Sequence, residues 1–136
     1  MNLSEKGLKL LTQREGVRKK AYKDTKGIWT IGVGHTGPEV HEGLVWSVPQ
    51  VMAALDADVQ WAEDAVNAVD SPLSQNQFDA LVSFVFNIGA SAFYNSTIKK
   101  LLNKGEYELV AAQFDRWVIP KEITARRMSE KEQFLS

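Results

Sequence analysis

The sequence of 136 residues contains no cysteine and only two histidines. The lack of cysteine excludes disulfide bonds, thiol catalysis and thiolate metal ligands, and two histidines are too few for most zinc centres unless carboxylates complete them. We therefore expect no metal site and no cofactor. A cysteine-free chain persists in oxidising and in reducing compartments alike, so this absence does not choose between them.

Lysine and arginine are absent from residues 36–95, although the net charge of the whole chain is only −1. This middle segment carries a charge of −8, whereas residues 1–35 carry +5 and residues 96–136 carry +2. A basic N-terminal segment suits an anionic polymer partner, and the alternative is a solvated surface without a partner. Nucleic acid would respond to the same charges, but no groove-reading motif is present, so we expect no nucleic-acid partner.

A secretory signal is missing as well, because charged residues interrupt the apolar positions between Met1 and Glu15. The longest uncharged stretch, residues 80–98, contains several serine, asparagine and threonine residues. This composition favours a buried helix followed by a turn over a membrane span. We expect a protein that starts in the cytoplasm, does not insert stably into membranes and is a monomer.

The length and the ordinary globular composition, with 44% hydrophobic and 24% charged residues, predict one domain. Its periodicity predicts an α+β fold with an N-terminal lobe at about 1–46, a connecting helix at about 48–69 and a helical C-terminal lobe at about 72–136. Ser47 and Ser74 are each followed by glutamine three residues later, a capping box that begins a helix. The apolar face that follows Ser47 predicts the longest helix of the chain, about twenty residues.

The N-terminal lobe is predicted to combine a short helix with a β-hairpin. Leucines at near-helical spacing indicate a helix from about Ser4 to Arg14, with Gly16 as its stop. The following pattern, Val17 to Asp24 and then Ile28 to Ile31, is typical of a hairpin with Gly27 at the position that needs a positive φ.

Three residues of this lobe are the main candidates for catalytic residues. Glu15 falls at a helix C-terminus, where the macrodipole disfavours negative charge by about 0.3 to 1 kcal/mol and so favours the protonated form that a general acid needs. Asp24 is expected opposite residue 28 in the hairpin, with Thr30 as its diagonal neighbour unless a bulge at Gly27 changes the parity. The structural alternatives are a surface glutamate, a turn-initiating aspartate and a strand-forming threonine.

Two carboxylates and a hydroxyl that holds a water are the minimum equipment for glycoside hydrolysis. The spacing Glu15, eight residues, Asp24, five residues, Thr30, followed by Ile31-Gly32-Val33-Gly34-His35-Thr36, resembles the catalytic signature of phage-type lysozymes, the endolysins of glycoside hydrolase family 24. The resemblance covers nearly the whole chain and continues in the segments 84–89, 93–97, Arg116-Trp117 and Arg126-Arg127 with Glu130.

The resemblance implies a lysozyme-like fold and a muramidase that cuts the β-1,4 bond between N-acetylmuramic acid and N-acetylglucosamine in peptidoglycan, for host cell lysis. Family members invert the anomeric centre, with Glu15 matching the general acid and with Asp24 and Thr30 matching the residues that place the attacking water. It also implies an enzyme that waits in the host bacterial cytoplasm, is released by a separate holin-like protein and acts on the periplasmic or extracellular cell wall.

Further substrate-binding residues are expected by the same resemblance, in part against structural alternatives. Each of these residue types has a structural alternative to a substrate contact. Glycine can end a strand, histidine can be hydrogen-bonded within the fold, serine, threonine and asparagine can cap a helix, and arginine can lie on the surface. The expected substrate-binding residues are Gly32, His35, Asn87, Ser96, Thr97 and Arg126.

Two rival hypotheses stay open beside the active muramidase. A lysozyme-like domain that serves as a binding or localisation module would keep the fold without turnover, and Glu15, Asp24 and Thr30 argue against it. A basic nucleic-acid-binding domain is the other rival. Clearing of a peptidoglycan suspension separates the first two.

Overall fold

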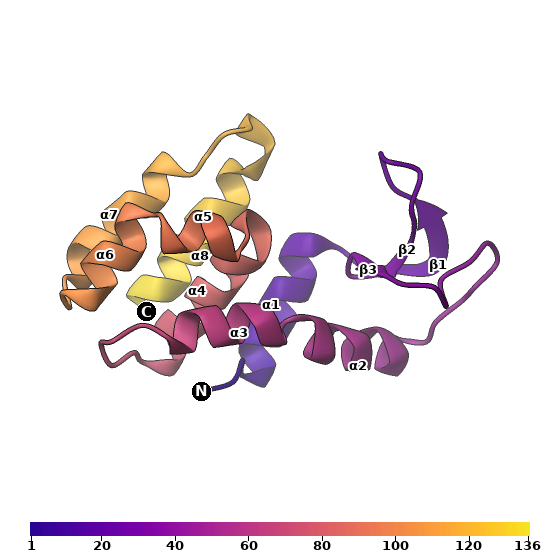
Figure 1. The fold of residues 1–136 in the computed structure, drawn as a ribbon, viewed down its shortest axis with the longest axis horizontal. Helices are drawn as coiled ribbons and strands as arrows, with labels where there is room; N and C mark the ends of the chain where they lie inside the picture. The colour runs from indigo at the N-terminus through magenta and orange to yellow at the C-terminus, as the bar shows by residue number, and fades with distance from the viewer. The chain divides into compact units, whose positions relative to one another are not determined.

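The computed structural model describes residues 1–136, and the chain divides into two compact units (Figure 1). The N-terminal unit is Lys9–Gln60, and the C-terminal unit combines Met1–Leu8 with Trp61–Ser136. The elements are α1 (Glu5–Glu15), β1 (Arg18–Lys23), β2 (Trp29–Gly32), β3 (His35–Thr36), α2 (Val48–Asp58), α3 (Gln60–Asn67), α4 (Gln75–Ile88), α5 (Ala90–Tyr94), α6 (Thr97–Asn103), α7 (Tyr107–Gln113), the 3-10 helices η1 (Phe114–Arg116) and η2 (Lys121–Ile123), and α8 (Thr124–Leu135). The α+β, mainly helical class is confirmed, and no helix has the length and apolarity to cross a bilayer.

The expected hairpin is present, and its register keeps the predicted parity. Tyr22 pairs with Thr30, and the Asp24 N–H donates to the Ile28 carbonyl at 2.9 Å. An irregularity lies between Arg18 and Tyr22, and Gly27 occupies the turn with φ +78°. Because the bulge falls before Tyr22, it leaves the pairing near the turn unchanged.

Pairing on both sides stabilises the middle of the small sheet. The strand β3 pairs with the free edge of β2 at Thr30 and Thr36. On the far edge of β1, the Ala21 N–H donates to the Leu44 carbonyl at 2.9 Å. Beneath these strands lies a compact core with Ala21, Ile31 and Val40 buried against Trp29, Leu44 and Trp46. Thr30 is thereby held within the sheet rather than at its edge.

The prediction of one long helix at 48–69 is wrong. The capping box of Ser47 and Gln50 does begin α2, but the helix ends at Asp58 with Val59 as its C-cap, and α3 starts anew at Gln60. The apolar stripe continues through the break, because Leu55, Val59 and Ala62 are all buried. Apolar periodicity indicates which face of a helix is buried, but it does not show whether the backbone hydrogen bonding is continuous. Neither glycine nor proline, which commonly interrupt helices, occurs at the break. The longest helix is α4, with 14 residues.

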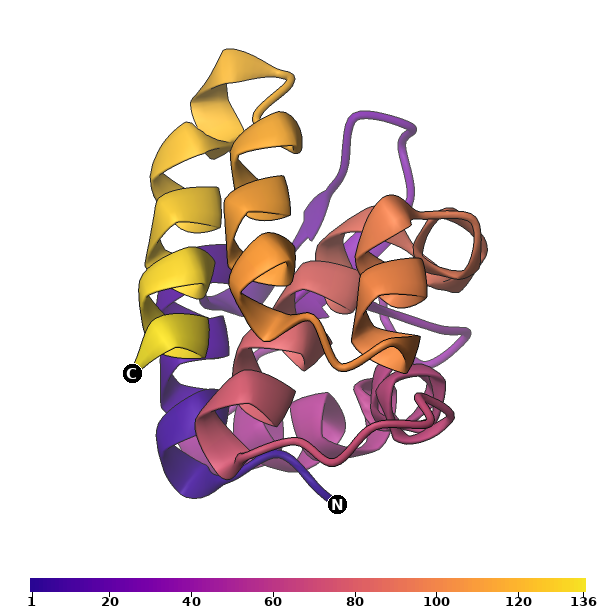
Figure 2. The same ribbon diagram turned by 90° about the vertical axis from the view of Figure 1, so that its left-hand side faces the viewer.

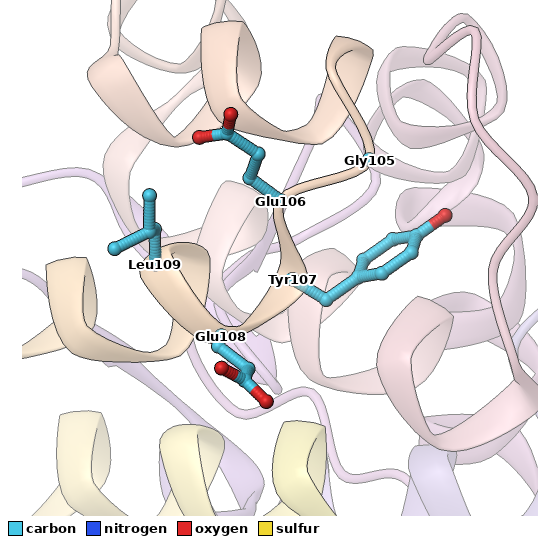
Figure 3. Close-up of a pocket in the computed structure, with 5 residues that line it drawn as sticks. All are labelled: Gly105, Glu106, Tyr107, Glu108 and Leu109. Atoms are coloured by element: carbon cyan, nitrogen blue, oxygen red, sulfur yellow. The ribbon is translucent and has the colours of Figure 1, made fainter.

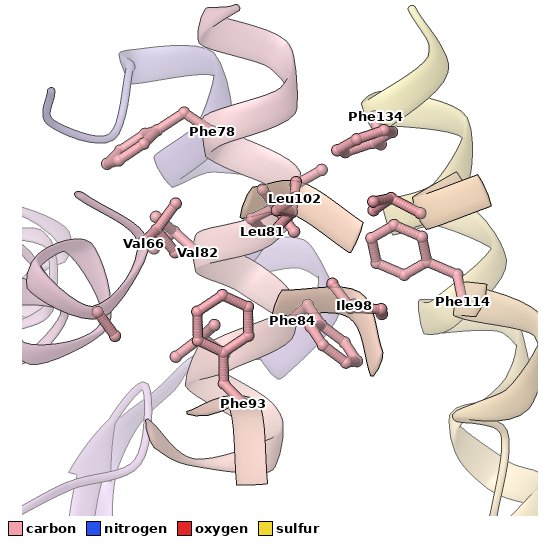
Figure 4. Packing of buried hydrophobic residues seen from close by; sticks show 14 of the residues in the cluster. Val66, Phe78, Leu81, Val82, Phe84, Phe93, Ile98, Leu102, Phe114 and Phe134 are labelled. Atoms are coloured by element: carbon pink, nitrogen blue, oxygen red, sulfur yellow. The ribbon is translucent and has the colours of Figure 1, made fainter. Parts of the chain in front are cut away.

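The helix α4 forms the centre of the C-terminal unit. Its capping box is formed by Ser74 and Gln77, and every residue from Phe78 to Val85 is buried. Phe84 packs edge-on against Phe114, with ring centroids 5.3 Å apart. Side chains from several helices converge around α4 (Figure 4), and α7 and α8 lie side by side in the same unit (Figure 2).

The start of α1 is tied to α4 by a buried carboxylate. Asp79 is 1% exposed and accepts hydrogen bonds from the Ser4 N–H at 3.1 Å, from the Ser4 hydroxyl and from the Gln75 side-chain amide at 2.8 Å. The Ser4 hydroxyl in turn accepts from the Gly7 N–H at 2.9 Å. A Cβ atom on Gly7 would stand 2.5 Å from Asp79 Cγ, so only glycine permits this close approach.

Gly7→Ala tests this packing against helix propensity. Alanine is favoured over glycine by about 1 kcal/mol in a helix interior, but the clash with Asp79 is expected to lower the free energy of unfolding by about 1 to 3 kcal/mol. Thermal unfolding followed by circular dichroism measures the change, with the exposed neighbour Lys6→Ala as the control. A variant more stable than the wild type would contradict the close approach.

Candidate active site

Glu15 is the last residue of α1, as expected. The helix stops there because Gly16 adopts φ +80°, with its N–H donating to the Thr12 carbonyl at 2.9 Å. The Glu15 residue is exposed. The Glu15 side chain is therefore carried by the final turn of a regular helix.

Asp24 follows β1 and has two distinguishable carboxylate oxygens. Oδ1 accepts hydrogen bonds from the N–H groups of Lys26 at 2.8 Å and Ile28 at 2.9 Å, which fixes the carboxylate on the turn. Oδ2 is the oxygen that the turn does not use. The turn thus orients the carboxylate and leaves one oxygen for other chemistry.

Thr30 lies in β2 and is 4% exposed. Its hydroxyl donates to the Ile28 carbonyl at 2.9 Å, so its proton is engaged and its lone pairs are directed elsewhere. The side chain can therefore accept a hydrogen bond from a water molecule. Thr30 and the Asp24–Ile28 pair occupy the diagonal positions that the hairpin register predicts.

His35 lies between two carboxylates. Its Nδ1 is 2.7 Å from Asp58 Oδ2, its Nε2 is 2.6 Å from Glu39 Oε1, and its ring tilts against Trp46. Burial lowers the pKa of His35, but hydrogen bonds to Glu39 and Asp58 and the charges of both more than offset it, so the pKa is raised. The hydrogen bond from His35 lowers the pKa of Glu39. With both ring nitrogens engaged, His35 links β3 to α2.

Gly32 is also buried within the N-terminal unit. It has φ +69°, and a Cβ there would contact the Trp46 ring at 3.4 Å and the Val51 side chain at 3.5 Å. Its conformation and packing account for glycine at this position without a ligand.

The remaining expected residues lie in the C-terminal unit in different environments. Ser96 is buried as the N-cap of α6, with its hydroxyl donating to the Phe93 carbonyl at 2.6 Å and accepting from the Lys99 N–H at 3.1 Å. Thr97 is exposed and lines a hollow of about 300 Å³ with Gln113, Arg116 and Trp117. Asn87 is exposed too. Thr97 and Asn87 thus reach the surface, whereas the Ser96 hydroxyl is used inside the chain.

The C-terminal unit also contains a charge cluster formed by Arg126, Arg127 and Glu130. Arg126 donates through Nε to Glu130 Oε2 at 3.2 Å and through Nη2 to the Ser83 carbonyl at 2.9 Å. Arg127, Glu130 and Ser83 are fully buried beside it. Burial lowers the pKa of Arg127, and the charge and hydrogen bond of Glu130 oppose this shift. The sequence-based set of site residues misses Arg127, Glu130 and Ser83, although the arginine pair with a glutamate three residues on was a visible signal.

A second hollow, of about 450 Å³, surrounds the start of α7 (Figure 3). Glu106, Tyr107 and Glu108 line it, but their side chains point in different directions. The Tyr107 hydroxyl is already donated to the Pro72 carbonyl. Binding sites need convergent polar groups, and this hollow lacks them.

The hairpin surface is strongly cationic. Its five lysine and arginine side chains form no ion pair, and the guanidinium of Arg18 stacks 4.2 Å from the centre of the Tyr22 ring. Such a surface attracts anionic polymers at short range. The five residues are Arg18, Lys19, Lys20, Lys23 and Lys26.

A carboxylate at a helix end, a second carboxylate anchored on a turn and a strand hydroxyl are groups of the kind that glycoside hydrolysis uses, and they lie in one unit of a mainly helical fold with a small sheet. The family model described as "Phage lysozyme" matches residues 12–130. The chain belongs to the phage lysozyme family, and it is a lysozyme-type hydrolase.

Individual relatives agree with the family. The endolysin of Salmonella phage P22 is 43% identical over an alignment of 145 positions, which covers 100% of this chain and 99% of that protein. A crystal structure of a mutant P22 lysozyme superimposes with a TM-score of 0.95 at 41% identity, covering 100% of this chain and 99% of that one. The muramidase domain of SpmX from Asticaccaulis excentricus gives 0.92 at 37% identity, covering 99% and 98%.

His35→Gln is expected to show pH-dependent destabilisation. A raised histidine pKa contributes stability that is present below about pH 6.5 and is lost as the pH rises through the folded-state value. The lowered Glu39 pKa adds stability above about pH 4.5 that is lost on further acidification. The difference in Tm between wild type and variant is therefore larger at about pH 5.5 than at about pH 8.5.

The exposed histidine His41, changed to glutamine, serves as the control for this measurement, because its Nδ1 contacts only the Glu42 carbonyl. Equal differences in Tm at the two pH values would show that the charged pairs of His35 contribute nothing.

Proposed function

We propose that the protein hydrolyses the β-1,4 bond between N-acetylmuramic acid and N-acetylglucosamine in bacterial peptidoglycan by single displacement with inversion. The observation that carries this proposal is the register of the hairpin, with residue 24 opposite residue 28 and Thr30 diagonal to Asp24. Glu15, at the end of α1, belongs to the same unit. The family membership supports the same reaction.

Glu15 acts as the general acid that protonates the leaving glycosidic oxygen. Its place at the end of α1, in the same unit as Asp24 and Thr30, supports this role. Protonation of the leaving oxygen weakens the bond to the anomeric carbon while the oxocarbenium-like transition state develops.

Asp24 and Thr30 hold the attacking water on the opposite face of the sugar. A water that donates one proton to Asp24 Oδ2 and the other to the Thr30 hydroxyl oxygen directs its lone pair outward, and Asp24 accepts the proton as the new bond forms. The backbone hydrogen bonds to Asp24 Oδ1 and the hydrogen bond from Thr30 to Ile28 orient both acceptors in advance. No covalent intermediate is needed.

Substrate contacts outside this group come from Asn87 and Thr97, both exposed in the C-terminal unit. The cationic hairpin surface, defined above by its five residues, favours approach to the anionic cell wall. Because its relatives include phage endolysins, the role proposed for the protein is host cell lysis. It waits in the host cytoplasm as a monomer until a holin-like protein releases it to the wall.

Glu15→Gln tests the general acid. The amide keeps the shape of the side chain but cannot supply the proton, so clearing of a peptidoglycan suspension should fall by about 10²- to 10⁴-fold. Circular dichroism and Tm should stay at wild-type values. Glu5→Gln, at the exposed start of the same helix, is the matched control and should keep full activity.

More than about a tenth of the wild-type rate in Glu15→Gln would remove this residue from the role of acid, because proton transfer contributes at least about a hundredfold.

The stereochemistry of the first product tests the role of Asp24 and Thr30 in holding the attacking water. Proton NMR of a β-linked cell-wall oligosaccharide during cleavage should show the α-anomer before mutarotation, because water attacks from the opposite face. Appearance of the β-anomer first would make Asp24 a candidate nucleophile and would refute the water-holding role.

A further inference from the structure

Arg18 is held on the hairpin by an aromatic ring and not by a carboxylate. Its guanidinium lies over the Tyr22 ring, with Cζ 4.2 Å from the ring centre, and its side chain forms no ion pair and no hydrogen bond within the chain. Contact with an aromatic ring engages the flat face of a guanidinium and leaves the N–H groups at its edge available. Because Arg18 is exposed, a ligand can reach these donors.

The register of the hairpin relates this cation to the proposed water-holding residues. Tyr22 pairs directly with Thr30 in the antiparallel ladder. Directly paired residues project from the same face of a sheet, with Cβ atoms about 4.5 to 5.5 Å apart. Asp24 follows Tyr22 by two positions and shares that face. The guanidinium over the Tyr22 ring therefore lies beside the face that carries Asp24 and Thr30.

Arg18 differs from the other cations of the hairpin surface. It is the only arginine among them, and the ammonium groups of the lysines are point charges without the planar pair of donors that matches a carboxylate. Lys23 also contacts a ring, with Nζ 5.4 Å from the centre of Trp29, but that pair occupies the next position of the ladder and so the opposite face. Directed recognition of a carboxylate beside Thr30 is therefore specific to Arg18.

We propose that Arg18 is a specificity-determining residue that binds a carboxylate of the peptidoglycan stem peptide through its paired N–H groups. This inference rests on the proposed function, which supplies peptidoglycan as the ligand. In intact peptidoglycan the lactyl carboxyl of muramic acid is consumed in the amide bond to the stem peptide, so the carboxylates belong to the peptide.

A guanidinium can bond both oxygens of such a carboxylate at once, which a hydroxyl or an acetamido oxygen does not allow. The Tyr22 ring restrains the Arg18 side chain before the ligand arrives, so less conformational freedom is lost on binding.

Arg18→Lys tests the paired contact while keeping the charge. The lysine retains the long-range attraction to an anionic polymer but loses the planar donor pair. We expect KM for soluble peptidoglycan strands to rise about tenfold, with kcat within about twofold of the wild type, measured by the release of reducing ends. Tm should be unchanged, because Arg18 is exposed and forms no hydrogen bond in the fold. A KM equal to that of the wild type would leave only general attraction and would overturn the inference.

The matched control changes the substrate instead of the protein. Carbodiimide-driven amidation converts the carboxylates of the same strands to neutral amides. On amidated strands the KM of the wild type should rise by at least about tenfold. Arg18→Lys should then have the same KM as the wild type, because neither protein can form the contact. A tenfold difference between the two proteins that persists on amidated strands would refute recognition of a carboxylate.

A binding readout in the wild-type protein separates this inference from the proposed function, because it needs no turnover. The NMR resonance of the Arg18 Nε–H group should shift on addition of peptidoglycan fragments with free carboxylates and should stay in place with the amidated fragments. Equal shifts with both, or no shift with either, in a protein that clears peptidoglycan would overturn the role of Arg18 alone. Failure of the wild type to clear peptidoglycan would instead refute the proposed function.

Discussion

One carboxylate, that of Glu130, forms ion pairs with two guanidinium groups in the C-terminal unit. It accepts from Arg126, Arg127 and Ser83, and it thereby joins α8 to α4. Removing one partner of such a buried pair costs about 3 to 5 kcal/mol, since the other charge is left uncompensated. The aromatic packing of Phe84 and the orientation of Asn87 both depend on the place of Arg127, and Arg127 depends on Glu130.

The N-terminal unit is organised by a different interaction. Its apolar core is small, and backbone pairing supplies the order: β2 is paired on both edges, and β1 is paired with β2 and with the segment around Leu44. Backbone pairing defines position within a strand closely, because a slip of one residue would move every side chain to the other face. That constraint suits a unit in which Asp24 and Thr30 must keep one relative placement.

The candidate site residues of the two units are held in place by different kinds of interaction. In the hairpin, Asp24 and Thr30 are each held by a hydrogen bond to neighbouring backbone, so local structure suffices to orient them. Asn87 is oriented by a side chain from a helix forty residues further along the chain. The orientation of Asp24 and Thr30 therefore depends on local backbone structure, whereas the orientation of Asn87 depends on tertiary contacts.

The same division explains what could be predicted. The sequence predicts the helix ending at Glu15, the parity of Asp24 and Thr30, and the caps at Ser47 and Ser74, because each depends on residues within about ten positions. Tertiary structure alone decided the break at Val59, the engagement of both His35 nitrogens and the burial of Arg127 with Glu130. The contact of His35 with Asp58 and the contacts of Glu130 with Ser83 and of Arg127 with Asn87 join segments distant in the chain, and a local pattern of apolar and charged residues does not encode them.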